Sequence, residues 1–141
     1  MAGKITRIGR LLSQGYGFWR EETYRRLGEY GFDDIRESHS PIFRYCESEP
    51  RRTADLARLA GMTKQSMGYL VSAMEKAGYV ELIPDPGDQR AQLVRFTARG
   101  HKANAALAEI SRSLETQLAE KIGAEELETL RALLGQITPE E

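Results

Sequence analysis

The sequence holds little of what catalysis, metal binding or disulfide bonding requires. Its 141 residues include one cysteine, Cys46, and two histidines, His39 and His101. One cysteine excludes an intramolecular disulfide, and the two histidines have no second cysteine or histidine cluster beside them to form a metal site. No phosphate-cradling glycine loop and no nucleophile–histidine–acid grouping is recognisable. We therefore expect a protein that is not an enzyme and that holds no metal or cofactor.

Long apolar segments are also missing. No run approaches the ~18 residues of a membrane span. Charged residues occur early, without the unbroken apolar stretch of a secretory signal. Apolar residues make up 40% and charged residues 29%, as in globular proteins. We expect one domain over residues 1–141, cytoplasmic and with no membrane partner.

The net charge of −1 by itself gives no indication of a nucleic-acid partner, but its distribution does. Residues 51–102 carry 9 basic and 5 acidic side chains, whereas residues 103–141 carry 3 basic and 8 acidic ones. The positive excess is modest, and chance segregation would also produce it. It indicates where along the chain an anionic partner would bind.

The middle of the chain predicts two short helices separated by a glycine turn. Thr53 is a good N-cap for the first helix, which Gly61 ends. Thr63 caps a second helix over residues 64–76, and Gly78 follows as a C′ glycine. Two helices joined by a short glycine-containing turn are typical of a helix-turn-helix.

The second of these helices has two different faces. Its apolar residues recur at helical spacing and predict a buried face: Met67, Leu70, Val71 and Met74. Its other face is polar: Lys64, Gln65, Ser66, Tyr69 and Ser72. Lysine can bind phosphates and glutamine can pair bidentately with adenine. An ordinary solvated helix face is the alternative for this helix taken alone.

A β-hairpin is predicted to follow. Residues 79–83 and 92–96 alternate as strands, with Val80 and Leu82 on one face and Val94 and Phe96 on one face. Residues 84–91 contain two prolines and a glycine, which favour a turn. We expect this loop to protrude and to carry Asp88 and Arg90. A helix-turn-helix followed by such a hairpin is a winged helix.

These segments resemble the multiple-antibiotic-resistance regulator (MarR) family of bacterial transcription factors. The resemblance rests on the helix pair TADLARLAGMTKQSMGYLVSAMEKAGYV, the wing DPGDQRA and the following LVRFTARG. It covers roughly residues 50–102. It implies that the second helix enters the DNA major groove and that Asp88 places Arg90 against the minor groove.

The resemblance also implies how the chain is divided. Residues 34–97 would form the winged helix-turn-helix lobe, and residues 4–30 and 98–137 would form a helical dimerisation region. The C-terminal helices, divided at Gly123, carry apolar stripes that need a partner. The expected fold is therefore mainly α with a small β-hairpin wing, assembled as a homodimer.

The DNA-binding residues predicted from these arguments lie in the second helix, in the wing and just before the first helix. They are Thr63, Lys64, Gln65, Ser66, Tyr69, Ser72, Asp88, Arg90, Arg51 and Arg52. For the pair Arg51 and Arg52, a solvated linker is an equal alternative to phosphate contact.

An effector site is predicted near four aromatic or imidazole side chains: Tyr16, Trp19, His39 and Phe43. Family members respond to small phenolic, anionic or otherwise aromatic effectors. Core packing would explain the same side chains. Some members sense peroxides through a cysteine in the first helix. This chain has none there, and we expect Cys46, in the next helix over residues 38–47, to be a small buried apolar residue.

The sequence thus predicts a double-stranded-DNA-binding transcriptional regulator, acting as a homodimeric repressor on a pseudo-palindromic operator and released by a small aromatic effector. The alternative is a winged-helix module that binds protein instead of DNA. That alternative predicts an apolar or acidic recognition face, which the lysine, glutamine and serine of residues 64–66 argue against.

Overall fold

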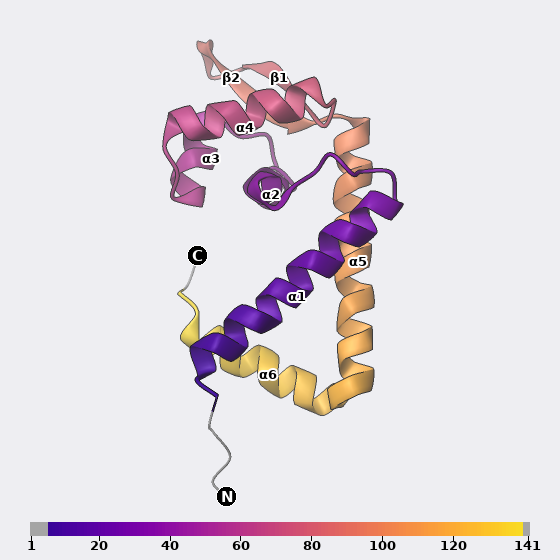
Figure 1. Cartoon of the computed structure of the whole chain (residues 1–141). Coiled ribbons are helices and arrows are strands. Elements are labelled where there is room, and N and C mark those ends of the chain that lie inside the picture. The colour runs from indigo at the N-terminus through magenta and orange to yellow at the C-terminus, as the bar shows by residue number, and fades with distance from the viewer. Residues whose placement is uncertain (1–5, 140–141) are drawn as a thin grey trace, which may run out of the picture. The chain divides into compact units, whose positions relative to one another are not determined.

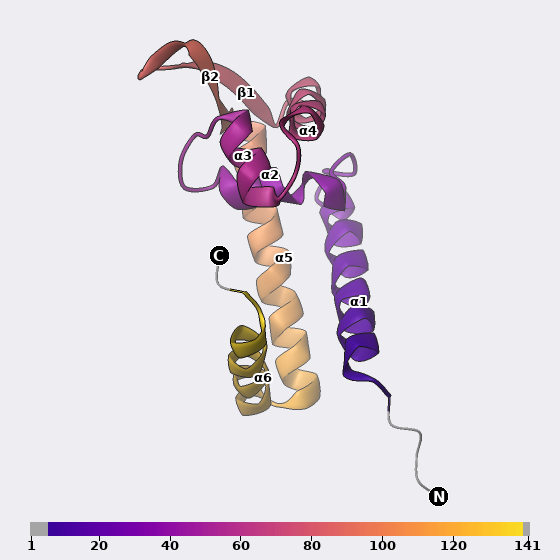
Figure 2. The ribbon, with the colours of Figure 1, turned by 90° about the vertical axis from the view of Figure 1, so that its left-hand side faces the viewer.

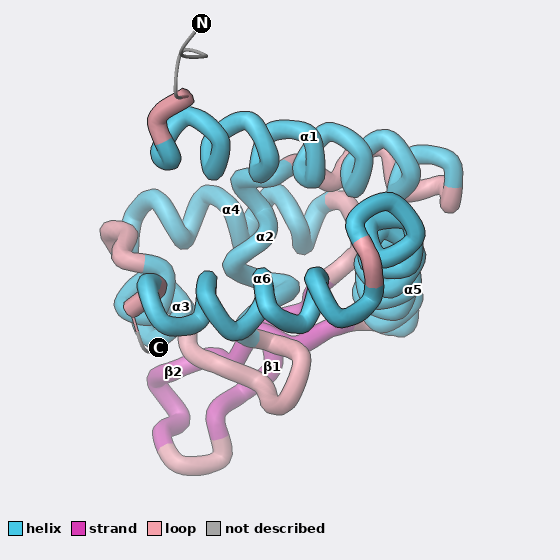
Figure 3. Tube along the Cα trace, turned by 90° about the horizontal axis from the view of Figure 1, so that it is seen from below, coloured by secondary structure: helices cyan, strands magenta, loops and turns pink. Residues whose placement is uncertain are grey.

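The computed structural model describes residues 6–139. The elements in chain order are α1 (Ile8–Glu29), the 3-10 helix η1 (Glu37–His39), α2 (Ser40–Tyr45), α3 (Thr53–Ala60), α4 (Lys64–Lys76), β1 (Val80–Asp85), β2 (Asp88–Phe96), α5 (Ala98–Ile122) and α6 (Ala124–Ile137). Figure 3 shows that helices dominate and that the strands of the described part form one hairpin. The predicted mainly α winged helix-turn-helix fold is confirmed.

The chain divides into two compact units, Met1–Leu107 and Ala108–Glu141. The first contains the helix-turn-helix and the hairpin, and the second contains the end of α5 and all of α6. The single-domain organisation and the lobe boundaries expected above stay predictions.

The N-terminal helices differ in detail from the expected ones. Helix α1 begins at Ile8, and the start predicted at residues 4–5 lies outside the described residues. The helix predicted over residues 38–47 is instead η1 followed by the six-residue α2. The Nδ1 atom of His39 accepts a 3.0 Å hydrogen bond from the backbone N–H of Arg36, which closes η1 as a cap. Pro41 lies in the first turn of α2, where its missing N–H costs nothing.

The N-cap of helix α3 lies one residue before the predicted one. The backbone N–H of Leu56 donates to the carbonyl of Arg52, so Arg52 is the N-cap and Thr53 is the first helical residue. The reason lies in the preceding residue, because Arg51 pairs with Val94 as an isolated β-bridge and holds the chain extended up to Arg52. The prediction that Thr53 caps this helix was wrong.

Both ends of helix α4 lie where the sequence places them. The Oγ1 atom of Thr63 accepts a 3.1 Å hydrogen bond from the backbone N–H of Ser66, as an N-cap side chain does. Gly61, in the turn between α3 and α4, has φ +65°, and Gly78, after α4, has φ +86°. Glycine adopts such angles with little cost, so it ends both helices. Figure 1 shows the resulting α3–turn–α4 unit.

The hairpin is longer than predicted. Its antiparallel ladder pairs Val80 with Phe96 and continues to Asp85 opposite Asp88, with an irregularity between Pro84 and Asp85. The expected loop over residues 84–91 therefore shrinks to the two residues between the strands, and Asp88 and Arg90 lie in β2. A two-stranded ribbon has two open edges, so Pro84 needs no hydrogen-bond partner on its outer side.

An aromatic cluster forms the core beneath the hairpin. Phe43 of α2 stacks on Phe96 of β2 at 5.5 Å between ring centroids and meets the edge of Tyr79 at 6.2 Å. Cys46 is buried nearby, and burial raises the pKa of its thiol to about 11, so it stays protonated and acts as an apolar residue. The prediction for Cys46 is confirmed.

In the second unit, Gly123 separates α5 from α6 with φ +105°. Arg131 of α6 donates to Glu115 of α5 at 2.9 Å and to Glu128 at 3.3 Å. Helix α6 buries none of its residues, and Leu133 and Ile137 are 54% and 67% exposed. No helix among the described residues is long and apolar enough to span a membrane.

Candidate nucleic-acid interface

The two predicted faces of α4 are confirmed by burial. Met67, Val71 and Met74 are at most 4% exposed and pack into the core, whereas Leu70 of the same predicted face is half-buried. On the other side Lys64, Gln65 and Ser66 are exposed, Tyr69 is 69% exposed, and Ser72 is half-buried. An exposed tyrosine ring beside polar side chains is a surface suited to contact with a partner.

Local hydrogen bonds organise the N-terminal end of this face. The hydroxyl of Thr63 receives the cap bond and also donates to the Oγ atom of Ser66 at 2.9 Å. The amide of Gln65 donates to the hydroxyl of Tyr69 at 3.4 Å. Thr63 is therefore engaged in holding the helix start. The long side chains of Gln65 and Tyr69 lie one turn apart on the outer surface, within reach of a bound groove.

The wing carries a single far-projecting cation. The side chain of Arg90 is 95% exposed, and its Nε atom lies 3.7 Å from Oδ1 of Asp88. The same Asp88 oxygen accepts a 3.0 Å hydrogen bond from the backbone N–H of Arg90. Figure 2 shows the tip of the hairpin projecting away from α2, α3 and α4. The two residues are together as predicted, although they lie in a strand and not in a loop.

The structure brings Arg51 and Arg52 against the wing, where both have partners. The Nε atom of Arg51 donates to the carbonyl of Tyr45 at 2.6 Å, and its guanidinium pairs with Glu49 at 3.3 Å. Arg52 donates to Asp85 through Nε at 2.7 Å and Nη2 at 2.5 Å. Both arginines thus have partners, and no local sequence signal predicts the pair of Arg52 with Asp85, 33 residues away.

The four residues predicted for an effector site occupy different environments. Phe43 is 4% exposed within the aromatic core, and His39 is 8% exposed. Burial, together with the neighbouring Arg36, lowers the pKa of His39. Trp19 is half-buried on α1, and Tyr16 is 56% exposed and donates to Glu37 at 2.6 Å. The effector role of these residues stays a prediction.

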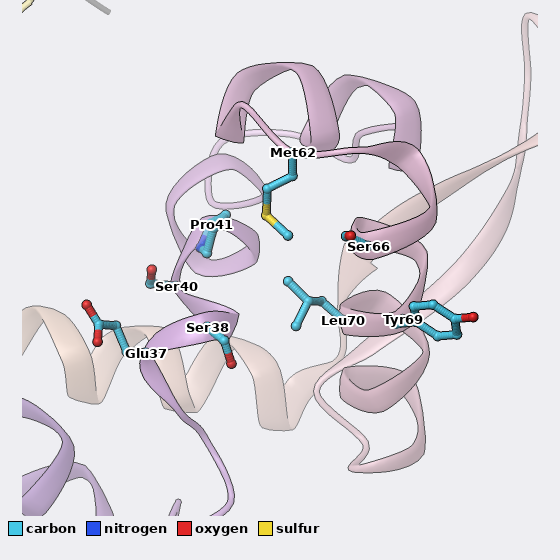
Figure 4. A pocket seen from close by; sticks show the side chains of 8 residues that line it. All are labelled: Glu37, Ser38, Ser40, Pro41, Met62, Ser66, Tyr69 and Leu70. Atoms are coloured by element: carbon cyan, nitrogen blue, oxygen red, sulfur yellow. The ribbon is translucent and has the colours of Figure 1, made fainter.

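An open cavity of about 580 Å³ lies between α2 and α4. Its lining combines a carboxylate, three serine hydroxyls, a tyrosine and apolar side chains: Glu37, Ser38, Ser40, Pro41, Met62, Ser66, Tyr69 and Leu70. Figure 4 shows Met62 and Leu70 pointing into it, while the hydroxyl of Tyr69 points away. None of the four predicted effector residues lines this cavity, and the sequence missed it because its walls are 20 or more residues apart along the chain.

Among the residues that the structure describes, no three or more His, Cys, Asp or Glu side chains gather closely enough to hold an ion.

The outer face of α4 and the wing together present a capped helix with polar side chains, followed by an exposed arginine on a hairpin. Such an arrangement suits contact with two neighbouring grooves of a duplex.

The chain was compared with known proteins. Residues 31–91 match a model described as "MarR family". A search of curated protein sequences finds no match.

Solved structures match over nearly the whole chain. The reduced form of MarR from E. coli has a TM-score of 0.79 at 20% identity, covering 97% of this chain and 100% of that one. A probable transcriptional regulator from Pseudomonas aeruginosa has a TM-score of 0.73 at 25% identity, covering 94% and 97%. A mutant of S. aureus MepR bound to an oligodeoxyribonucleotide has a TM-score of 0.66 at 18% identity, covering 94% and 96%. With the helix pair and the wing in agreement, residues 31–91 match the MarR family, and the chain has the winged helix-turn-helix fold of these solved structures.

Proposed function

We propose that this chain is a sequence-specific, double-stranded-DNA-binding repressor that acts as a homodimer on a pseudo-palindromic operator. The observation that carries the proposal is the pairing of two exposed features. Helix α4 turns a polar face outward while its opposite face is buried, and Arg90 follows at 95% side-chain exposure. An apolar recognition face or an acidic one would favour the protein-binding alternative instead.

In this proposal α4 enters the major groove by its N-terminal half. Gln65 makes the base-edge contact, with Ser66 and Tyr69 beside it, and Lys64 contacts a phosphate. The wing places Arg90 in the neighbouring minor groove. The structural neighbour bound to an oligodeoxyribonucleotide supports this use of the fold.

The homodimer is proposed from apolar surface at both ends of the chain. Ile8, Leu11 and Phe18 of α1 are 70%, 49% and 63% exposed, and α6 has exposed Leu133 and Ile137. Exposed apolar side chains on each of the two helices favour burial against a second copy. Two copies of α4 would then contact half-sites about one helical turn apart, ~34–36 Å.

Release by a small aromatic effector is the regulatory part of the proposal. Tyr16 and Trp19 lie on α1, and Tyr16 is tied to Glu37 at the start of η1. Trp19 is the only tryptophan, so its fluorescence reports directly on this region. If aromatic carboxylates and phenols change neither that fluorescence nor DNA affinity, this part of the proposal fails and the repressor is constitutive.

The decisive test of the proposal is selection of bound duplexes from random DNA. We expect enrichment of an inverted repeat with half-site centres about 10 base pairs apart. A library that shows no enriched sequence after several rounds would overturn sequence-specific DNA binding.

A further inference from the structure

We propose that Arg52 and Asp85 are positioning residues that fix the wing on the helix-turn-helix, so that Arg52 serves DNA binding through Arg90 instead of by touching a phosphate. The inference rests on the proposed DNA-binding function. It changes the role expected for Arg52 and assigns one to Asp85, which no sequence pattern singled out.

The two oxygens of the Asp85 carboxylate have separate tasks. Oδ1 accepts a 2.8 Å hydrogen bond from the backbone N–H of Gly87 and so closes the turn at the wing tip. Oδ2 accepts from Nε and Nη2 of Arg52, the N-cap residue of α3. One carboxylate therefore joins the turn of the hairpin to the start of the helix pair.

Burial and charge favour this pairing over a phosphate contact. The Asp85 side chain is only 13% exposed, whereas that of Arg52 is 42% exposed. Hydrogen bonds from the Gly87 N–H and from Arg52 hold the pKa of Asp85 below its usual range, so the carboxylate is charged and the guanidinium is engaged near neutral pH. A phosphate would have to displace a charge-assisted bond that is already made.

The backbone beside Arg52 also attaches the hairpin to the start of α3. Arg51 and Val94 exchange two hydrogen bonds, of 3.0 Å and 2.7 Å, which pin the chain before α3 to strand β2. The bridge fixes one point on the hairpin, and the Arg52–Asp85 pair fixes a second point towards its tip. Two points of attachment restrict the hinge motion of the ribbon, which otherwise has only its two strands to stiffen it.

The test compares Asp85→Asn with a matched control on the selected operator. Asparagine keeps an oxygen for the Gly87 N–H but loses the charge that holds Arg52. Glu81→Gln removes the same charge from the same strand, where Glu81 pairs only with exposed Arg95. We expect Asp85→Asn to weaken operator binding about threefold to tenfold. This range reflects the difference in strength between a charged and a neutral hydrogen bond. Glu81→Gln should leave binding unchanged or slightly stronger.

Double variants that also carry Arg90→Ala distinguish a positioning role of Asp85 from general damage to the protein. In an Arg90→Ala background, Asp85→Asn should have no further effect on affinity, because the contact that it positions is already gone. Arg52→Gln in the same background should leave the slope of log affinity against log salt unchanged. A phosphate contact would instead lower that slope by about 0.9 per site.

The inference is overturned if Asp85→Asn strengthens binding, if it costs as much without Arg90 as with it, or if Arg52→Gln lowers the salt slope in the Arg90→Ala background. A wild-type protein that prefers no sequence would overturn the proposed function instead. Equal circular dichroism and melting of the variants show that folding does not explain the result.

Discussion

Replacing Arg90 with alanine tests the wing directly. The side chain is 95% exposed, and its one ion pair, with Asp88, has a 3.7 Å separation. Such an exposed pair contributes little to stability, so the unfolding midpoint should not move. A guanidinium in a narrow A·T-rich minor groove makes a strong contact, so operator affinity should fall at least ~10-fold.

The size of the salt effect follows from counting contacts. Each cation that leaves the duplex lowers the slope of log affinity against log salt by about 0.9, so a dimer with two altered wings should lose about 1.8. The measurement is fluorescence anisotropy of a labelled operator at several salt concentrations. Arg90→Lys should recover part of the affinity, because lysine keeps the charge but not the planar fork.

Two comparisons decide whether the reasoning about the wing holds. Arg95→Ala removes the same charge from the same strand, at a residue paired with Glu81 at 2.7 Å, and should leave the preference for A·T flanks intact. Asp88→Ala should weaken binding although it removes a negative charge, because Asp88 orients the arginine. Stronger binding by the Asp88 variant would refute this account of the wing.

The remaining predictions concern base recognition, packing and assembly. Gln65→Ala should cost ~1–3 kcal/mol on the selected operator and relax preference at one position, as binding to single-base variants measures; equal loss on every sequence would make it a phosphate contact. Gly100→Ala would place a Cβ 2.0 Å from the carbonyl oxygen of Tyr79, so unfolding by denaturant should show a loss of about 1–3 kcal/mol or more. Gly68→Ala, which meets nothing within 4 Å, is its control and should cost nothing. Leu133→Glu, at a 54% exposed site, should shift sedimentation at micromolar concentration towards the monomer, and an unchanged dimer would exclude α6 from the interface.

Local signals in the sequence were sufficient to locate both ends of helix α4. Thr63 and Gly78 act through their own backbone angles and nearest turns, so residue type alone locates both ends of α4. Alternation of apolar residues likewise predicted both strands of the hairpin, and the ladder pairs their buried residues Val80 and Phe96.

Contacts between residues far apart in the chain account for two features that the sequence mispredicted, the N-cap of α3 and the length of the hairpin. Thr53 is a good cap by type, but the bridge between Arg51 and Val94 sets where α3 begins. The proline-rich segment before Asp88 looked like a loop, yet the ladder continues through it because the ribbon has an open edge. Neither effect has a signature within a short window of sequence.

The same limit applies to the candidate site. The sequence pattern found the exposed face of α4 and the exposed arginine of the wing, which depend on local periodicity and a tight turn. It could not assign a partner to Arg52, and it could not separate the buried, stacked ring of Phe43 from a ligand-binding one. Both distinctions need the packing of segments far apart in the chain.

The measurement that tests the central claim most directly is the ratio of two affinities at one salt concentration. The wild-type protein is titrated onto its selected inverted repeat and onto a scrambled duplex of the same length and composition, near 150 mM salt. The account predicts one dimer per repeat and a ratio of at least ~10³. A ratio near one would contradict it, because binding would then depend on charge alone and the outer face of α4 would recognise no sequence.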